Sequence, residues 1–199
     1  VQERLPAHFS FILWDACDQF YGRSNLLPKH TGVDPIGPSE SAFIYQRDSF
    51  YMATVTSGDQ WPYLQHRGGK PGFLRVINQN LIGFADYKGN RQMISTGNLS
   101  SNDRVALFLM DYPSRERLKI MGHGQVKDAR NHPKLVEELV DEPDRRFVER
   151  IFLIDIVSFD WNCPKYIMPR YTREEVDQLT NPLKQEISDL KEKLSQRNR

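Results

Sequence analysis

One segment of the chain, residues 60–98, concentrates the residue types that bind an anion. It holds five basic side chains and one acidic side chain, a net charge of +4, whereas the whole chain of 199 residues carries +1. It also holds six of the 12 glycines. Glycines let backbone N–H groups approach a ligand, and arginine pairs with phosphate oxygens through a planar fork. The segment predicts a site for a phosphate on a polar, planar ligand, although a solvated basic loop explains the same pattern.

Other patterns that carry chemistry are missing from the sequence. It contains no Gly-x-Gly-x-x-Gly, no phosphate-loop signature, no His-Glu-x-x-His and no Gly-x-Ser-x-Gly. The five histidines are scattered, and none has a partner at the spacing of metal ligands. The sequence therefore predicts neither a metal site nor a hydrolase triad, and no residue stands out as a general acid or base.

The elements that must position the basic segment are mostly short strands. Runs rich in β-branched and aromatic residues predict seven strands, at 51–56, 61–67, 73–78, 81–86, 105–110, 118–126 and 147–159. Gln79 and Asn80 leave hairpin spacing between the third and fourth strands. Helices are expected near 40–47 and 133–142. The sequence thus predicts a mainly β fold, an antiparallel barrel with flanking helices.

The two ends of the chain differ from this central part. We predict an N-terminal helical and loop arm at 1–39, a barrel domain at 40–170 and a helical tail at 171–199. Thr172 and Glu175 fit a capping box, and Asn181–Pro182 fits a second helix start, so the tail is expected to form helices over 173–180 and 182–196. Its regularly spaced leucines favour either packing on its own domain or pairing with another chain.

Composition narrows the class of protein. Hydrophobic residues make up 39% and charged residues 27%, as in globular proteins. The near-neutral net charge argues against a nucleic-acid partner. A mean hydropathy of −0.61 and the lack of a long apolar run argue against a membrane span. Two distant cysteines, Cys17 and Cys163, are expected to be free thiols, and with no secretory-signal pattern at the start we expect a cytoplasmic protein.

Three motifs occur in order along the central part. They are His-Arg-Gly-Gly-x-Pro-Gly at 66–72, Asp-Tyr-x-Gly-Asn-Arg-Gln-x-Ile-Ser-x-Gly-Asn-Leu at 86–99 and Arg-Leu-Lys-Ile-x-Gly at 117–122. Over about residues 40–170 this series resembles the pyridoxamine 5′-phosphate oxidase-like flavoproteins. The resemblance implies a split β-barrel with Greek-key-like topology that binds FMN. It also implies a homodimer with the flavin at the subunit interface.

The resemblance further implies which residues bind the cofactor. Arg67 and the two following glycines would lie beside the isoalloxazine ring and the ribityl chain, the segment from Asn90 to Ser95 would hold the phosphate, and Arg117 would lie near the ring. Ordinary alternatives are surface arginines, helix caps and a β-bulge. The full predicted set is His66, Arg67, Gly68, Gly69, Asn90, Arg91, Gln92, Ser95, Asn98 and Arg117.

The end of the barrel segment departs from true pyridoxamine 5′-phosphate oxidases. Their Arg-x-His-type substrate motif is missing, so pyridoxamine phosphate is not the expected substrate. Residues 160–170 instead resemble the Asn-Cys-Pro motif of another branch of these flavoproteins. Four residues there would line the open face of the flavin or only tie the barrel to its tail: Asn162, Cys163, Lys165 and Arg170.

Three functions follow from these expectations. The first is an FMN-dependent oxidoreductase acting on a small-molecule substrate or electron donor, in which the flavin carries the redox chemistry. The second is a protein that binds FMN, haem or a deazaflavin without turnover. The third is a structural dimerisation module whose barrel is empty and whose helical tail recruits a partner.

Overall fold

The computed structural model describes residues 35–89, 92–161 and 164–197. The described chain forms two compact units. One comprises the chain up to Met110 together with the part that begins at Arg117, and it contains the sheet. The other comprises Asp111–Glu116 and the chain from Pro164 onward, and it contains the tail helix. The domain boundaries expected from the sequence stay a prediction.

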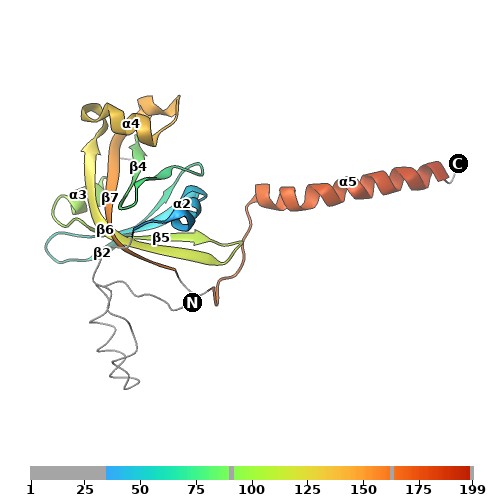
Figure 1. Ribbon diagram of the computed structural model, residues 1–199, viewed down its shortest axis with the longest axis horizontal. Coiled ribbons are helices and arrows are strands. Elements are labelled where there is room, and N and C mark those ends of the chain that lie inside the picture. Colours follow the sequence, from blue (N-terminus) through green and yellow to red (C-terminus); the bar gives the residue numbers. More distant parts are fainter. Residues whose placement is uncertain (1–34, 90–91, 162–163, 198–199) are drawn as a thin grey trace, which may run out of the picture. The chain divides into compact units, whose positions relative to one another are not determined.

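Seven strands form one antiparallel sheet in the first unit (Figure 1). Their spatial order is β2-β1-β5-β6-β7-β4-β3. Strands β5, β6 and β7 follow one another, and β4 lies beside β7, which is a Greek-key arrangement. The strands are β1 (Ser49–Val55), β2 (Pro62–Gly68), β3 (Leu74–Asn78), β4 (Leu81–Tyr87), β5 (Arg104–Asp111), β6 (Glu116–Asp128) and β7 (Val148–Trp161).

The predicted fold class, mainly β and antiparallel with flanking helices, is confirmed. The sheet does not close into a full barrel, because its edge strands β2 and β3 do not pair with each other. Each of the seven expected strands is present within two residues of its expected bounds. The expected hairpin is also present, since Asn78 pairs with Leu81 across Gln79 and Asn80. Short helices are α2 (Pro38–Tyr45), α3 (Ile94–Leu99) and α4 (Pro133–Leu139), with single 3₁₀ turns at Ala129–Asn131 and Asp144–Phe147.

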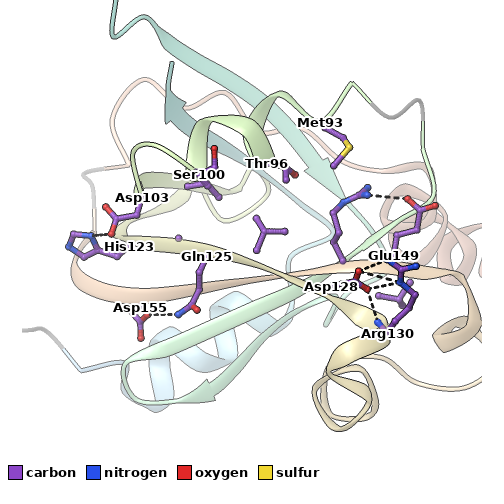
Figure 2. A pocket seen from close by; sticks show the side chains of 15 residues that line it. Met93, Thr96, Ser100, Asp103, His123, Gln125, Asp128, Arg130, Glu149 and Asp155 are labelled. Atoms are coloured by element: carbon purple, nitrogen blue, oxygen red, sulfur yellow. Dashed lines mark hydrogen bonds and ion pairs between the residues drawn. The ribbon is translucent and has the colours of Figure 1, made fainter. Parts of the chain in front are cut away.

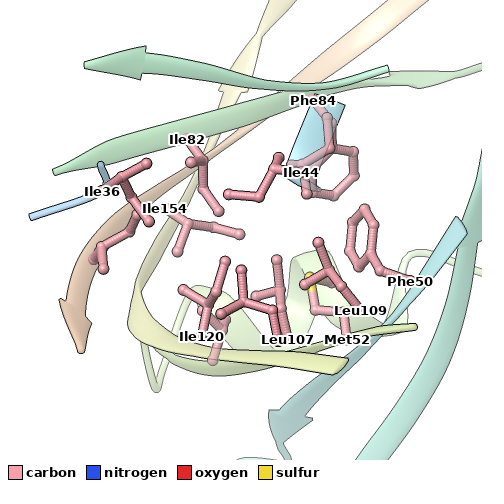
Figure 3. Close-up of a cluster of buried hydrophobic side chains, with 14 of the residues drawn as sticks. Ile36, Ile44, Phe50, Met52, Ile82, Phe84, Leu107, Leu109, Ile120 and Ile154 are labelled. Atoms are coloured by element: carbon pink, nitrogen blue, oxygen red, sulfur yellow. The ribbon is translucent and has the colours of Figure 1, made fainter. Parts of the chain in front are cut away.

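Apolar side chains from opposite parts of the sheet fill its interior (Figure 3). Phe50 of β1 packs edge-on against Phe84 of β4 at 5.3 Å between ring centroids, and Phe84 stacks on Phe152 of β7 at 4.9 Å. All three rings are at most 1% exposed. Burying one such ring contributes about 1.5–3 kcal/mol, so these contacts curl the sheet although β2 and β3 share no ladder.

A bulge lets the long strand β6 bend around this core. The pairing of β6 with β7 shifts register between Met121 and Gly122. A Cβ atom at Gly122 would collide with the carbonyl oxygen of Asp155 on β7. Only glycine permits this close approach, and a bulge of this kind bends its strand and increases the local twist.

Helix α2 packs against β3 and covers the core near the end of β7. Trp161 donates from Nε1 to Glu40 Oε1 at 2.8 Å, and its ring meets Phe43 edge-on at 4.8 Å. Helix α4 lies on β4 and β7 with a second, smaller apolar cluster beneath it.

The second unit contains helix α5 (Arg173–Arg197). The predicted capping box is confirmed, because Thr172 N–H donates to Glu175 Oε2 at 2.7 Å and Glu175 N–H donates to Thr172 Oγ1 at 3.2 Å. The prediction of two tail helices is wrong, since α5 continues through Pro182. A proline removes one hydrogen bond from a helix and strains the preceding turn, but this helix continues beyond it. No helix in the described ranges has the length and apolar character needed to cross a bilayer.

Candidate functional site

A small hollow of about 160 Å³ opens between strand β2, the end of β4 and helix α3. Its lining includes three of the residues that the sequence predicted for cofactor binding, Arg67, Gln92 and Ser95. Strand β2 alternates between half-buried and exposed residues, so Tyr63, Gln65 and Arg67 all turn toward this hollow.

An ion-pair cluster links the two sides of the split sheet at this hollow. Arg67 of β2 donates from Nη1 to Asp86 Oδ1 at 2.9 Å. Arg150 of β7 donates from Nε to Asp86 Oδ2 at 2.8 Å, and its Nη2 also lies 2.8 Å from that oxygen. Arg150 also pairs with Glu149 at 3.1 Å. The cluster of two arginines and two carboxylates is therefore balanced in charge, and side chains join β2 to β4 where no backbone ladder does.

The Arg67 side chain also lies against the aromatic core. Its guanidinium carbon is 4.9 Å from the Phe152 ring centroid and 5.6 Å from that of Phe84. Its Nε atom is buried and has no hydrogen-bond partner among the residues that the structure describes. A buried donor left in this way costs about 1–3 kcal/mol, and native proteins seldom keep one without a reason.

Helix α3 forms the wall opposite β2. Ser95 is 1% exposed and donates from Oγ to Gln65 Oε1 at 2.8 Å, while Asn98 donates from Nδ2 to Thr54 Oγ1 at 2.9 Å. These bonds tie the helix to β2 and β1. Met93, just before the helix, has a left-handed backbone with φ of 53°. That conformation costs about 1–2 kcal/mol for a residue with a side chain, and such strain gathers at functional sites.

A larger hollow of about 1080 Å³ adjoins the small one and shares Met93, Thr96 and Arg150 with it (Figure 2). Helix α3 forms one wall, and outward-facing residues of β6 and β7 form the other. Its volume lies just above the roughly 300–1,000 Å³ usual for ligand pockets. On its rim His123 Nδ1 lies 3.0 Å from Asp103 Oδ2, with both side chains about half exposed.

Two acidic groups in these linings, Asp128 and Tyr87, have shifted pKa values. Hydrogen bonds from Arg130 lower the pKa of Asp128, in the larger hollow, from its ordinary 3.8 to about 2. Burial raises the pKa of the Tyr87 phenol, in the small hollow, and the Asp144 carboxylate acts in the same direction. Asp128 is therefore charged and Tyr87 protonated near neutral pH.

The structure separates several other predicted residues from the small hollow. His66 is exposed on the opposite face of β2 from Arg67, with its ring edge-on to Tyr51. Gly68 ends β2, and Gly69 gives room to Phe73, because a Cβ at Gly69 would lie 2.7 Å from Phe73 Cγ. Five residues of the predicted cofactor-binding set line neither hollow: His66, Gly68, Gly69, Asn98 and Arg117.

The remaining predicted residues lie elsewhere in the chain. Lys165 and Arg170 belong to the second unit, where the Arg170 guanidinium lies 5.0 Å from the centroid of the Tyr112 ring. Four predicted residues fall outside the described residues: Asn90, Arg91, Asn162 and Cys163.

Sequence reasoning did not select most of the residues that line the small hollow, among them Tyr63, Gln65, Asp86 and Arg150. Tyr63 and Gln65 were detectable, because a period of two places them on the same face of β2 as Arg67. Asp86 and Arg150 pair across strands 64 residues apart in the sequence. The one available signal for Arg150 was a charge at the start of a run of apolar residues, 151–154. Within the described ranges, no three His, Cys, Asp or Glu side chains gather as metal ligands would.

Comparison with known proteins finds resemblance in structure alone. No protein-family model and no curated protein matches the sequence. A variant of HupZ from Group A Streptococcus is 10% identical, with a TM-score of 0.49 over 64% of this chain and 99% of its own. A protein of Lactobacillus delbrueckii described as a "putative pyridoxamine 5′-phosphate oxidase" is 16% identical, with a TM-score of 0.47 over 66% of this chain and 96% of its own.

An FMN-binding protein from Syntrophomonas wolfei is 12% identical, with a TM-score of 0.44 over 62% of this chain and 83% of its own. Structural resemblance is thus found to proteins described as a putative pyridoxamine 5′-phosphate oxidase and as FMN-binding, the kind that the sequence motifs indicate. At these identities and scores it says nothing of a ligand or an activity for this chain.

Proposed function

We propose that this chain binds FMN in the two adjoining hollows and acts as an FMN-dependent oxidoreductase. The observation that carries the proposal is the small hollow itself. It collects Arg67, Gln92 and Ser95, which come from two of the three motifs, and one of these residues keeps a buried donor that no described residue satisfies.

The lining residues fit a phosphate-bearing planar ligand. The small hollow is polar but too small for a whole mononucleotide, and the larger one has room for a planar ring system. Because the Arg67, Asp86, Arg150 and Glu149 cluster is balanced in charge, we assign the countercharge of the phosphate to Arg91, next to Gln92 in the sequence. Bound FMN would supply the redox chemistry of its isoalloxazine ring.

The chain's own residues would hold and orient this cofactor. Hydrogen bonds from Ser95 to Gln65 and from Asn98 to Thr54 fix helix α3 against the sheet, which keeps the wall of the small hollow in place. Asp86 is engaged by two arginines, so it is not free to move a proton. Proton exchange with a substrate is then left to water or to groups on the rim of the larger hollow.

A homodimer is part of the same proposal. The outer face of strands β1 and β2 exposes apolar side chains, with Leu64 64% and Tyr51 38% exposed. Ala53 pairs with both Leu64 and Ala106, which extends this surface onto β5. A second copy of the chain would cover it. Sedimentation velocity of the purified protein tests this, and a monomer at micromolar concentration would contradict it.

The decisive variant is Arg91→Ala, with Arg75→Ala as its matched control. Arg75 belongs to the same basic segment, but it pairs with Asp141 at 2.7 Å and lines neither hollow. Loss of a charge-assisted contact worth about 1.5–3 kcal/mol weakens FMN binding about 10- to 150-fold. The control is expected to bind as the wild type does. Equal affinity of the Arg91 variant would remove that residue from the site.

Two further measurements separate the alternative functions. A flavin spectrum in the purified protein, with FMN released on denaturation, would eliminate an empty structural barrel. Stopped-flow mixing with NADH and NADPH then separates turnover from storage. Failure of every electron donor and acceptor would leave flavin binding without an activity of its own.

A further inference from the structure

Helix α5 contains an internal repeat of 11 residues. Residues 173–183 read Arg-Glu-Glu-Val-Asp-Gln-Leu-Thr-Asn-Pro-Leu, and residues 184–194 read Lys-Gln-Glu-Ile-Ser-Asp-Leu-Lys-Glu-Lys-Leu. Glutamate recurs at the third position and leucine at the seventh and eleventh, while the first position is basic and the fourth β-branched in both copies. The repeat lies wholly within the helix, so helix geometry determines which of its side chains share a face.

Eleven residues make almost three full turns of an α-helix, so the repeated positions return to one face. Their apolar side chains form a stripe nearly parallel to the helix axis, about 27 Å long at 1.5 Å per residue. Each of these side chains is between 43% and 62% exposed. The members of this apolar stripe are Val176, Leu179, Leu183, Ile187, Leu190 and Leu194.

The two flanks of the stripe carry opposite charges. At 100° per residue, Arg173, Lys184 and Lys191 lie 80–100° to one side of its centre, as estimated from helix geometry of about 3.6 residues per turn. Glu175 and Glu186 lie on the other side. Lys193, near the C-terminal end of the helix, is a basic residue on this otherwise acidic flank. Pro182 lies on this second flank as well, so its ring leaves the stripe uninterrupted.

We infer that the apolar stripe of α5 pairs with the same stripe of a second copy of the chain, in parallel and in register. In a parallel pair each basic flank lies beside the acidic flank of the other helix, so Lys184 faces Glu186 of the second copy. An antiparallel pair would instead place like charges opposite each other, which destabilises it. The 11-residue period further predicts a right-handed supercoil. This pairing is independent of flavin binding.

A cysteine at the stripe tests both the pairing and its direction. In parallel register, residue 190 of one helix lies opposite residue 190 of the other, within the 4.4–6.8 Å Cα separation that a disulfide needs. Leu190→Cys is made in the full chain together with Cys17→Ser and Cys163→Ser. Gln185→Cys, on the opposite side of the helix, is the matched control.

In a glutathione redox buffer the Leu190→Cys chain is expected to form at least ten times more disulfide-linked dimer than the Gln185→Cys chain. Equal cross-linking of the two chains, or no cross-linking of either, overturns the inference. The stripe would then pack on the chain's own barrel, on an antiparallel copy or on another protein. If the cysteine-free background does not fold, Leu190→Cys is made in the native chain, and peptide mass spectrometry identifies a link between two copies of residue 190.

A charge exchange gives a second, independent result. Adding Glu186→Lys to the Leu190→Cys chain places like charges on facing flanks, so cross-linking should fall several-fold at low salt. Adding Lys184→Glu as well restores opposite charges across the pair and should restore cross-linking. Failure of this restoration would overturn the parallel arrangement. All outcomes are read with and without FMN, so a failure of flavin binding leaves them unaffected.

Discussion

Asp86→Asn is the most informative single substitution in the first unit. It keeps the shape of the side chain but removes the charge that joins Arg67 of β2 to Arg150 of β7. The three side chains are 16–17% exposed, so water compensates only in part. The substitution therefore tests whether this cluster closes the split sheet between β2 and β4.

The expected cost follows from the contacts that are lost. Asp86 accepts hydrogen bonds from both arginines, each worth about 1.5–3 kcal/mol with a charged partner, and breaking a fully buried pair costs about 3–5 kcal/mol. Arg150 keeps Glu149, Arg67 keeps the ring of Phe152, and the new amide still accepts one bond. The free energy of unfolding should therefore fall by about 2–3 kcal/mol, which lowers Tm by about 4–12 °C.

Urea denaturation followed by tryptophan fluorescence measures this change. Asp155→Asn is the control, because that carboxylate is exposed and, among the described residues, accepts a hydrogen bond from Gln125, and it should cost less than about 0.5 kcal/mol. FMN affinity should not fall in the Asp86 variant, since the hollow gains positive charge. If Asp86→Asn unfolds at the same urea concentration as the wild type, the cluster does not hold the barrel and the reasoning is refuted.

Three smaller predictions concern packing and pH. Gly69→Ala places a methyl group 2.7 Å from Phe73 Cγ and should cost about 1–3 kcal/mol in a denaturant titration, whereas no loss would mean that this contact relaxes freely. Gly97→Ala, in α3 with open space around it, should instead gain about 0.5–1 kcal/mol by the same measurement. The lowered pKa of Asp128 means that its pairing with Arg130 stabilises the fold fully above about pH 4 and is lost as the pH falls toward 2. The stability difference between the wild type and Asp128→Asn should accordingly stay constant from about pH 5 to 8 and shrink below about pH 4, and a difference that grows on acidification would contradict this sign.

The strands were predictable because their signals are local. Runs of β-branched and aromatic residues mark the strands, and Gln79–Asn80 leaves only the room of a tight hairpin. The tail was harder, because Asn181–Pro182 has the pattern of a helix start. That pattern does not show whether the preceding turns are stable enough to carry the helix through a proline.

The site shows the limit of local signals more clearly. The period of two on β2 separates His66 from Arg67, so the sequence already implied that the two side chains face opposite sides. The meeting of Arg67, Asp86 and Arg150 depends on the order of strands in the sheet, which no local pattern specifies. The motifs could therefore suggest which residues bind a cofactor, but not that an ion-pair cluster would hold the hollow together.

The central claim is that this chain holds a phosphate-bearing flavin, and a comparison of FMN with riboflavin tests it most directly. Both ligands are titrated into protein freed of co-purified flavin, and quenching of flavin fluorescence is recorded. Because the two differ by the phosphate alone, FMN should bind at least about ten times more tightly, as a charge-assisted phosphate contact requires. Equal affinities, or no quenching by either ligand up to about 100 µM, would contradict the account.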